Sequence, residues 1–252
     1  MIIRSTLIRT FKECPAKAHL RYEMGLVRVG EPSVHLTVGK WMHEAIAKFH
    51  LEGFDQAAEL LRSKPWASLT PHRNKNLQKA LSLLYTYARV ATWKMEEVER
   101  PFNYWLRGYE WRGRFDGLGW WNGDLWIIEH KTSSLPDFQT KPNDQLPLYL
   151  LAAHQEGLKV EGILLNLLDF THLAVTPHPI TFTQDELNEW QAEAILVADY
   201  YRTCAARGVW PRQTRFCGQC PYLPICSASP EVRGRIIEGF YEVDEEALNK
   251  DW

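Results

Sequence analysis

The sequence has no long hydrophobic run. No segment of its 252 residues approaches the ~20 consecutive apolar residues that a helix needs to cross a bilayer. The N-terminal segment lacks the continuous apolar stretch of a secretory signal peptide, and neither an internal repeat nor a Gly/Ser-rich linker is visible. With 45% hydrophobic and 24% charged residues, the composition excludes collagen-like and wholly disordered chains. We therefore expect a cytoplasmic protein with no membrane segment and a substantial core.

An excess of positive charge is also missing. The 29 Lys and Arg residues are balanced by 31 Asp and Glu, which argues against a uniformly basic nucleic-acid coat. The charges are nevertheless uneven, because residues 62–79 and 201–215 contain basic residues and no acidic ones, whereas residues 238–252 are strongly acidic. Each basic stretch is either a phosphate-guiding surface or a solvated helix face, and the sequence leaves both interpretations open.

Cysteine is scarce and odd in number, which argues against a disulfide framework in an intracellular protein. Cys217, Cys220 and Cys226 form a C-x₂-C-x₅-C pattern stiffened by Gly and Pro, and this spacing is typical of thiolates that share a metal ion or cluster. A fourth ligand is needed, and two cysteines remain. Cys204 lies in a predicted helix, where a buried free thiol is the default, and Cys14 lies near the N-terminus.

Hydrophobic spacing predicts helices and strands in an alternating order. The predicted helices cover residues 5–22, 37–52, 74–98 and 143–157, and a further helix starts at the capping box of Thr183 and Glu186 and ends near Gly208. Strands are predicted within residues 102–131 and at 160–168. This order predicts an α/β fold with a mixed sheet.

Asn122-Gly123 predicts a tight hairpin turn. This dipeptide favours the two-residue type I′ turn, because both turn positions require positive φ. With these two residues in the loop, Trp121 pairs with Asp124, and every further pair of residues sums to 245.

The same register places Asp116 opposite Glu129, with both side chains on one face. Lys131, two residues beyond Glu129, shares that face. Opposed carboxylates repel each other and raise one pKa, so we expect a cation between them, and oxygen ligands favour Mg²⁺ or Mn²⁺. The alternatives are a solvated hairpin with chance acidic residues, or a bulge that shifts the register.

Four short motifs resemble the PD-(D/E)XK nucleases, and most closely their RecB-like branch. That branch has a G-x-x-x-H helix, a G-x-x-D strand, a (D/E)-x-K strand and a Q-x-x-x-Y helix. The matching segments occur in the same order, as Gly39–His43, Gly113–Asp116, Glu129–Lys131 and Gln145–Tyr149. There are two departures. Phe115 stands where a Pro is expected, and Pro147 suggests that the Gln145 helix begins later, because proline is accepted only in a first helical turn.

The resemblance implies a restriction-endonuclease-like mixed sheet flanked by helices, and a divalent-metal centre. Its implied ligands are His43, Asp116, Glu129 and the main-chain carbonyl of His130. Lys131 would contact the attacking water or the scissile phosphate, and Gln145 and Tyr149, one helical turn apart, would orient the site or a DNA phosphate. Taken singly, His43, Gln145 and Tyr149 are equally consistent with ordinary core or surface roles.

Cys14 resembles the distant N-terminal cysteine of RecB-like nucleases that carry a 4Fe-4S cluster, among them the AddB nuclease domain and the CRISPR-associated nucleases. This resemblance implies a structural cluster held by Cys14, Cys217, Cys220 and Cys226. A Cys₄ zinc site is the alternative. The expected organisation is one nuclease domain over residues 1–230, with a cluster subdomain from 1–36 and 200–230, followed by an acidic tail at 231–252.

These features together predict a metal-dependent deoxyribonuclease that acts as an exonuclease on single-stranded DNA or duplex ends. Phage recombination, DNA repair and CRISPR adaptation are all compatible with this activity. The alternative is a non-cleaving DNA-binding or assembly subunit with the same fold. Ala47 replaces the second histidine of a zinc-protease motif, and Gly39-Lys40 lacks the rest of a P-loop. The chain therefore has no ATP motor, and its expected protein partners are a second copy of itself or a separate helicase or recombination protein.

Overall fold

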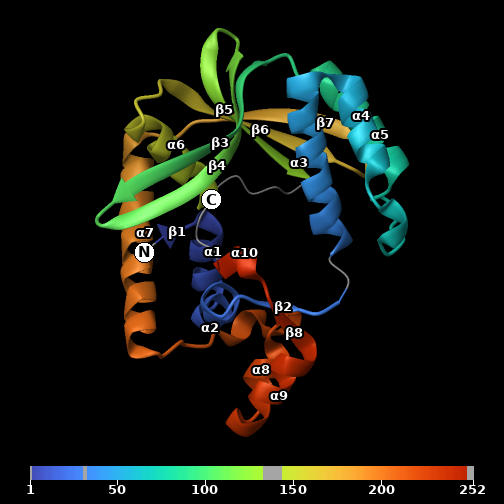
Figure 1. Cartoon of the computed structure of the whole chain (residues 1–252). Coiled ribbons are helices and arrows are strands. Elements are labelled where there is room, and N and C mark those ends of the chain that lie inside the picture. Colours follow the sequence, from blue (N-terminus) through green and yellow to red (C-terminus); the bar gives the residue numbers. More distant parts are fainter. Residues whose placement is uncertain (1, 31–32, 133–143, 249–252) are drawn as a thin grey trace. The chain divides into compact units, whose positions relative to one another are not determined.

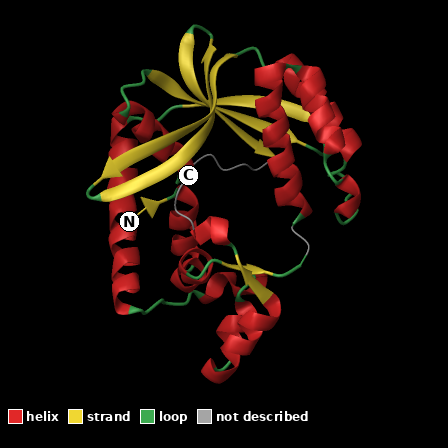
Figure 2. Ribbon diagram, in the orientation of Figure 1, coloured by secondary structure: helices red, strands yellow, loops and turns green. Residues whose placement is uncertain are grey.

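The chain divides into two compact units in the computed structural model (Figures 1 and 2), which describes residues 2–30, 33–132 and 144–248. The first unit comprises Met1–Gly30, Asn103–Gly113 and Gln184–Trp252, and the second comprises Glu31–Phe102 and Arg114–Thr183. Strands β3 (Lys94–Leu106) and β4 (Tyr109–Trp121) each contribute residues to both units. None of the helices in the described ranges is both long enough and apolar enough to span a membrane.

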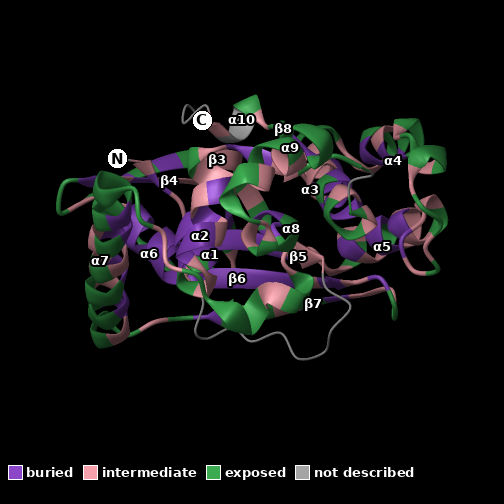
Figure 3. Ribbon diagram, turned by 90° about the horizontal axis from the view of Figure 1, so that it is seen from below, coloured by how far each residue is buried: buried purple, intermediate pink, exposed green. Residues whose placement is uncertain are grey.

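The second unit is built on a mixed sheet. Besides its parts of β3 and β4, its elements are α3 (Val34–Glu52), α4 (Phe54–Ser63), the 3₁₀ turn η2 (Trp66–Ser68), α5 (Leu77–Val90), β5 (Asp124–Thr132), α6 (Gln145–Gln155), β6 (Val160–Asp169) and β7 (Ala174–Ile180). The strand order is β4-β5-β6-β7, with β3 also paired to β4. Strands β5 and β6 are parallel, whereas β4–β5 and β6–β7 are antiparallel. Most of β6 is buried (Figure 3), as expected for a central strand covered on both faces.

Helices cover both faces of this sheet. Buried apolar residues of α3, α4 and α5 form one core cluster with Trp126, Ile128 and Leu164 of the sheet. Ile127 and Leu165 alternate with these residues and therefore point to the opposite face. Helix α6, which packs against β6, has a buried residue at nearly every position. The predicted α/β class, with a mixed central sheet flanked by helices, is confirmed.

The first unit is mainly helical. Its elements are β1 (Ile2–Ile3), α1 (Ser5–Glu13), α2 (Pro15–Ala18), the π-helical turn η1 (His19–Glu23), β2 (Leu26–Arg28), α7 (Gln184–Arg207), the 3₁₀ turn η3 (Thr214–Gln219), α8 (Leu223–Ser227), α9 (Pro230–Phe240), β8 (Tyr241–Val243) and α10 (Glu245–Leu248). Strand β1 pairs in parallel with the start of β4, and β2 pairs antiparallel with β8. Residues 231–248, which we expect to be part of an acidic tail, thus include most of α9, the paired strand β8 and the helix α10, while 249–252 lie outside the described residues.

Three local differences from the predicted elements have identifiable causes. The predicted 74–98 helix ends at Val90, and β3 begins at Lys94. Strand β7 is not among the predicted strands, because Pro177 and Pro179 are unusual in a strand. The strand tolerates both prolines because it lies at the edge of the sheet. Helix α6 begins at Gln145, not later. Proline is accepted at position 147 because it falls in the first turn, where backbone N–H groups make no hydrogen bond within the helix.

Candidate active site and cysteine cavity

The β4–β5 hairpin forms as its turn sequence predicts. Asn122 and Gly123 have φ values of 54° and 95°, the positive values that a type I′ turn requires. The ladder runs from Trp121↔Asp124 to Gly117↔Ile128, and every pair sums to 245. The predicted register is therefore confirmed at each of these pairs. The predicted pair Asp116–Glu129 would come next, but it is not part of the ladder, which ends at Gly117↔Ile128.

Beyond the end of the ladder, the Asp116 side chain makes the hydrogen bonds to β5. Its Oδ2 accepts hydrogen bonds from the main-chain N–H of His130, at 2.7 Å, and from the His130 ring Nδ1, at 3.2 Å, while Oδ1 lies 3.3 Å from Nδ1 of His43. Burial raises the pKa of Asp116, but the nearby His43 and the bonds from His130 outweigh burial and hold this pKa well below its usual range. Asp116 is therefore ionised and fixed in position.

Glu129 has the opposite character. It is almost fully buried, and burial together with the charge of Asp116 raises its pKa to about 7, although Lys131 acts in the other direction. Its Oε1 is ion-paired with the Lys131 ammonium, whereas Oε2 is buried and has no hydrogen-bond partner among the residues that the structure describes. A buried carboxylate oxygen without a partner is costly, and a cation at this oxygen would remove the cost.

Gln145 joins the residues of β5 to helix α6. Its Oε1 accepts a hydrogen bond from Lys131 Nζ at 2.6 Å, and its Nε2 donates to Glu129 Oε1 at 2.8 Å and to the Tyr149 hydroxyl at 2.6 Å. The Tyr149 hydroxyl donates in turn to the main-chain carbonyl of Arg114, at 2.8 Å. The two α6 residues, one turn apart, thus tie both strands of the hairpin to Lys131.

His43 reaches the site because α3 approaches β5 closely. A Cβ at Gly39, one turn before His43, would lie 2.9 Å from Thr132 Oγ1, so only glycine fits without a shift. Burial lowers the pKa of His43, but the charge of Asp116 and its hydrogen bond raise it further than burial lowers it, so the pKa is above its ordinary value. The structure brings the predicted site residues together in two bonded groups. His43 and His130 contact Asp116, whereas Lys131 and Gln145 contact Glu129, and Tyr149 is bonded to Gln145.

A chain of buried hydrogen bonds extends behind His130. The Tyr87 hydroxyl lies 2.9 Å from His130 Nε2, and His50 Nε2 lies 2.7 Å from the same hydroxyl. With Asp116 accepting from Nδ1, His130 must accept the Tyr87 proton at Nε2, which fixes its tautomer. Sequence reasoning missed Tyr87 and His50, and no local pattern distinguishes them from core residues.

The site residues fit a divalent cation chemically. In the part of the chain that the structure describes, no three His, Cys, Asp or Glu side chains form a group that could hold one metal ion as they stand, since Asp116 is bonded to His43 and Glu129 to Lys131. The partnerless Glu129 Oε2 and the set of two carboxylates and one imidazole nevertheless suit Mg²⁺ or Mn²⁺.

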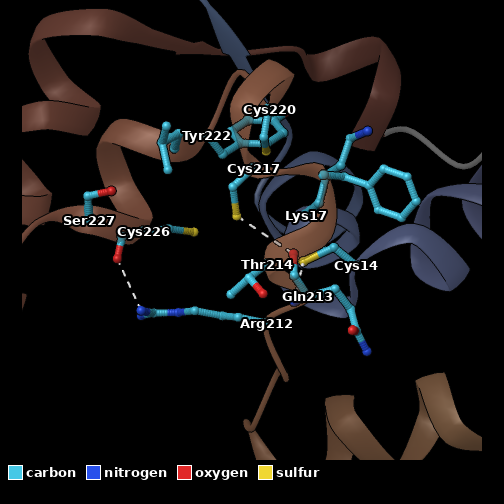
Figure 4. Close-up of a pocket in the computed structure, with 12 residues that line it drawn as sticks. Cys14, Lys17, Arg212, Gln213, Thr214, Cys217, Cys220, Tyr222, Cys226 and Ser227 are labelled. Carbon is cyan, nitrogen blue, oxygen red and sulfur yellow. Dashed lines mark hydrogen bonds between the residues drawn. The ribbon is translucent and has the colours of Figure 1, made fainter.

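In the first unit, four cysteines line one cavity of about 250 Å³ (Figure 4). These are Cys14, Cys217, Cys220 and Cys226. The main-chain N–H of Gln213 donates to Cys14 Sγ at 3.4 Å, and the Cys217 thiol donates to the Gln213 carbonyl at 3.7 Å. Burial raises the pKa of the Cys226 thiol, and the other three sulfurs raise it further, whereas the charge of Arg212 lowers it. Cys204 is buried in α7 and does not line the cavity, as predicted.

Some residues of the two basic stretches are engaged within the protein, whereas Arg62, Arg73 and the four arginines of the second stretch are exposed. In the first, Lys64 is ion-paired with Glu44, and Lys75 is buried with its ammonium 3.9 Å from the Phe170 ring centre. Burial lowers the pKa of Lys75 to about 8. In the second stretch, Arg212 donates to the Cys226 carbonyl at 3.0 Å. These residues are therefore not simply solvated helix faces, and a phosphate-guiding role stays a prediction.

Comparison with known proteins identifies a superfamily and a similar fold. A search of curated proteins gives no significant match. Among solved structures, a chain described as "Putative exonuclease" from Eubacterium rectale has a TM-score of 0.54 at 14% identity, covering 88% of this chain and 87% of that one, which shows the fold alone. The structure of SSO0001 has a TM-score of 0.44 at 18% identity, covering 89% of this chain and 85% of that one. The profile of the PD-(D/E)XK nuclease superfamily matches residues 5–227, so the chain belongs to that superfamily.

Proposed function

We propose that this protein is a divalent-metal-dependent deoxyribonuclease of the RecB-like branch, which acts as an exonuclease on single-stranded DNA or duplex ends. The observation that carries the proposal is the buried Glu129 oxygen without a partner, beside an ionised Asp116 and a Lys131 ammonium. Superfamily membership supports a nucleic-acid substrate. The exonuclease activity is suggested only by the description of the E. rectale chain.

Each residue of the network has a role in this reaction. His43, Asp116, Glu129 and the His130 carbonyl would hold the ion, which supplies polarisation of the phosphoryl oxygen and a water of lowered pKa. Lys131, held by Gln145 at 2.6 Å, would direct its ammonium at the attacking water or the scissile phosphate and stabilise the developing negative charge. Tyr149 holds Gln145 in place, so the two α6 residues orient Lys131 rather than react.

The cavity in the first unit supports a structural 4Fe-4S cluster over a zinc ion. A single tetrahedral zinc ion needs its four sulfurs roughly 3.8 Å apart, given Zn–S bonds of about 2.3 Å. A cluster binds each thiolate to its own iron and so accepts a wider set of sulfurs around a cavity. Iron and acid-labile sulfide assays after anaerobic purification test this assignment, and stoichiometric zinc without iron would contradict it.

Incubation with labelled single-stranded DNA and Mn²⁺, with and without EDTA, tests the nuclease. We expect degradation that EDTA prevents. It should be lost in Asp116→Ala, Glu129→Ala and Lys131→Ala, each of which should keep the circular dichroism spectrum of the unaltered protein. A stable shifted complex without degradation would instead identify a non-cleaving DNA-binding subunit.

A further inference from the structure

Glu99 interrupts β3 next to the candidate metal centre. Its φ is 54°, inside a strand, in the left-handed region that side chains other than glycine rarely adopt. The side chain lines the same pocket as His43, Asp116 and His130. Burial and the charge of Asp116 raise the pKa of Glu99, while Arg114 lowers it. A third carboxylate therefore lies at the centre, and its counter-ion is Arg114.

Arg114 holds Glu99 through one side of its guanidinium. Its Nε lies 2.6 Å from Glu99 Oε2, and 54% of the Arg114 side chain is exposed. Side chains two residues apart leave a strand on the same side, so Arg114 projects from the side of β4 that carries Asp116. The Tyr149 hydroxyl bonds to its main-chain carbonyl, which ties Arg114 to the network that holds Lys131.

The charges of the site suggest a role for Arg114 in binding phosphate. Lys131 is already paired with Glu129 and bonded to Gln145, so its ammonium is committed to the centre. Three carboxylates repel an approaching phosphodiester, and a cation at the entrance would offset this repulsion in addition to the metal ion. A planar guanidinium can bind two phosphate oxygens at once, which makes arginine better suited than lysine to this contact.

We propose that Arg114 binds a backbone phosphate of the nucleic-acid strand beside the scissile bond, and that Glu99 occupies the guanidinium until the strand arrives. The phosphate oxygens replace Glu99 Oε2, so one charge-assisted contact is exchanged for another and no covalent step is involved. This inference rests on the proposed nuclease function.

The test measures DNA binding separately from cleavage. Fluorescence anisotropy of a labelled single-stranded oligonucleotide, in EDTA and over a series of salt concentrations, gives the affinity and its salt dependence. For Arg114→Gln we expect affinity to fall about tenfold, and the slope of log K against log[salt] to become shallower by about 0.7, the loss of one phosphate contact on a single strand. Arg114→Lys should recover the slope but only part of the affinity. Glu99→Gln should tighten binding several-fold.

Arg100→Gln is the matched control. Arg100 adjoins Glu99 in β3 and is also ion-paired, to Glu97 and Glu156, neither of which lines the pocket. Its loss should leave both affinity and slope unchanged, and the thermal unfolding of all variants should show that they fold.

Two results would overturn the inference. The first is an unchanged affinity and slope in Arg114→Gln, and the second is weaker binding in Glu99→Gln. If the unaltered protein neither binds nor degrades DNA with Mn²⁺, the proposed function itself fails. If it does both while Arg114→Gln binds normally, only the role of Arg114 fails.

Discussion

The hairpin site and the cysteine cavity hold their polar groups in different ways. At the hairpin, side chains bind one another: Asp116 to His130, Gln145 to Lys131. In the cavity, the sulfur atoms of Cys14 and Cys217 each make a polar contact to the main chain of Gln213, and the neighbouring elements η3 and α8 are short. The hairpin is thus organised before any ion binds, whereas the fold around the cavity depends on whatever the four sulfurs hold.

The largest effect should follow from breaking the cavity. We expect Cys226→Ser to lower the midpoint of thermal unfolding by roughly 10 °C or more, because loss of a structural cluster removes several kcal/mol of folding free energy. Cys204→Ala, a buried thiol outside the cavity, should cost only a few degrees. Differential scanning calorimetry measures both, and equal shifts would contradict a structural role for the cavity cysteines.

At the hairpin, removal of a charged group should instead damage activity and spare the fold. Lys131→Ala should reduce the rate of DNA degradation by about 10²–10³-fold, the usual cost of losing a group that stabilises transition-state charge. Its unfolding midpoint should change by only a few degrees, because Lys131 is partly exposed and Glu129, whose pKa is already raised to about 7, can take up a proton when its partner is lost. A rate within threefold of the unaltered protein would remove Lys131 from the reaction.

Tyr87 sharpens the comparison, since it acts only through His130. Tyr87→Phe leaves His130 Nε2 and His50 without their shared hydroxyl, and supporting contacts of this kind are worth about 10–100-fold in metal affinity. Mn²⁺ titration followed by electron paramagnetic resonance should show this loss. Tyr85→Phe, on the same helix but exposed, should bind Mn²⁺ normally, and equal affinities in the two variants would argue against a positioning role.

The last prediction concerns pH. Because the folded-state pKa of Glu129 is raised to about 7, the folded protein binds this proton more tightly than the unfolded chain does. Stability from this group is present below the unfolded pKa, near 4.5, and is lost as pH rises to 7. In EDTA, the unaltered protein should therefore lose a few kcal/mol relative to Glu129→Gln over that interval. Denaturant titrations of both proteins measure the difference, and parallel pH profiles would refute it.

Local sequence signals predict the hairpin well. Asn122-Gly123 fixes both the turn and the register, because a two-residue loop leaves no freedom in the pairing. The motif spacing likewise identifies Gln145 and Tyr149, which share a helix face. These predictions succeed because each depends on residues that are close together in the chain.

Contacts between distant segments could not be predicted in the same way. Nothing near Tyr87 indicates that α5 packs where His130 emerges from β5. Glu99 reaches its pocket only through a distorted strand conformation, and it lies directly after the segment 74–98 that we interpreted as one helix. Alternation of exposed and half-buried residues covers only Lys94–Glu96, which is too short to separate the start of β3 from the preceding helix pattern.

The two oxygens of Asp116 have separate duties. One of them, Oδ2, accepts a hydrogen bond from the main-chain N–H of His130 where the backbone ladder between β4 and β5 ends. This side-chain contact therefore links the two strands. Only Oδ1, on the His43 side, is available to anything that enters. An ion at this centre can therefore bind Asp116 through a single oxygen. Binding through both oxygens would break the hydrogen bond from His130 that links β4 to β5, the strand that carries Glu129 and Lys131.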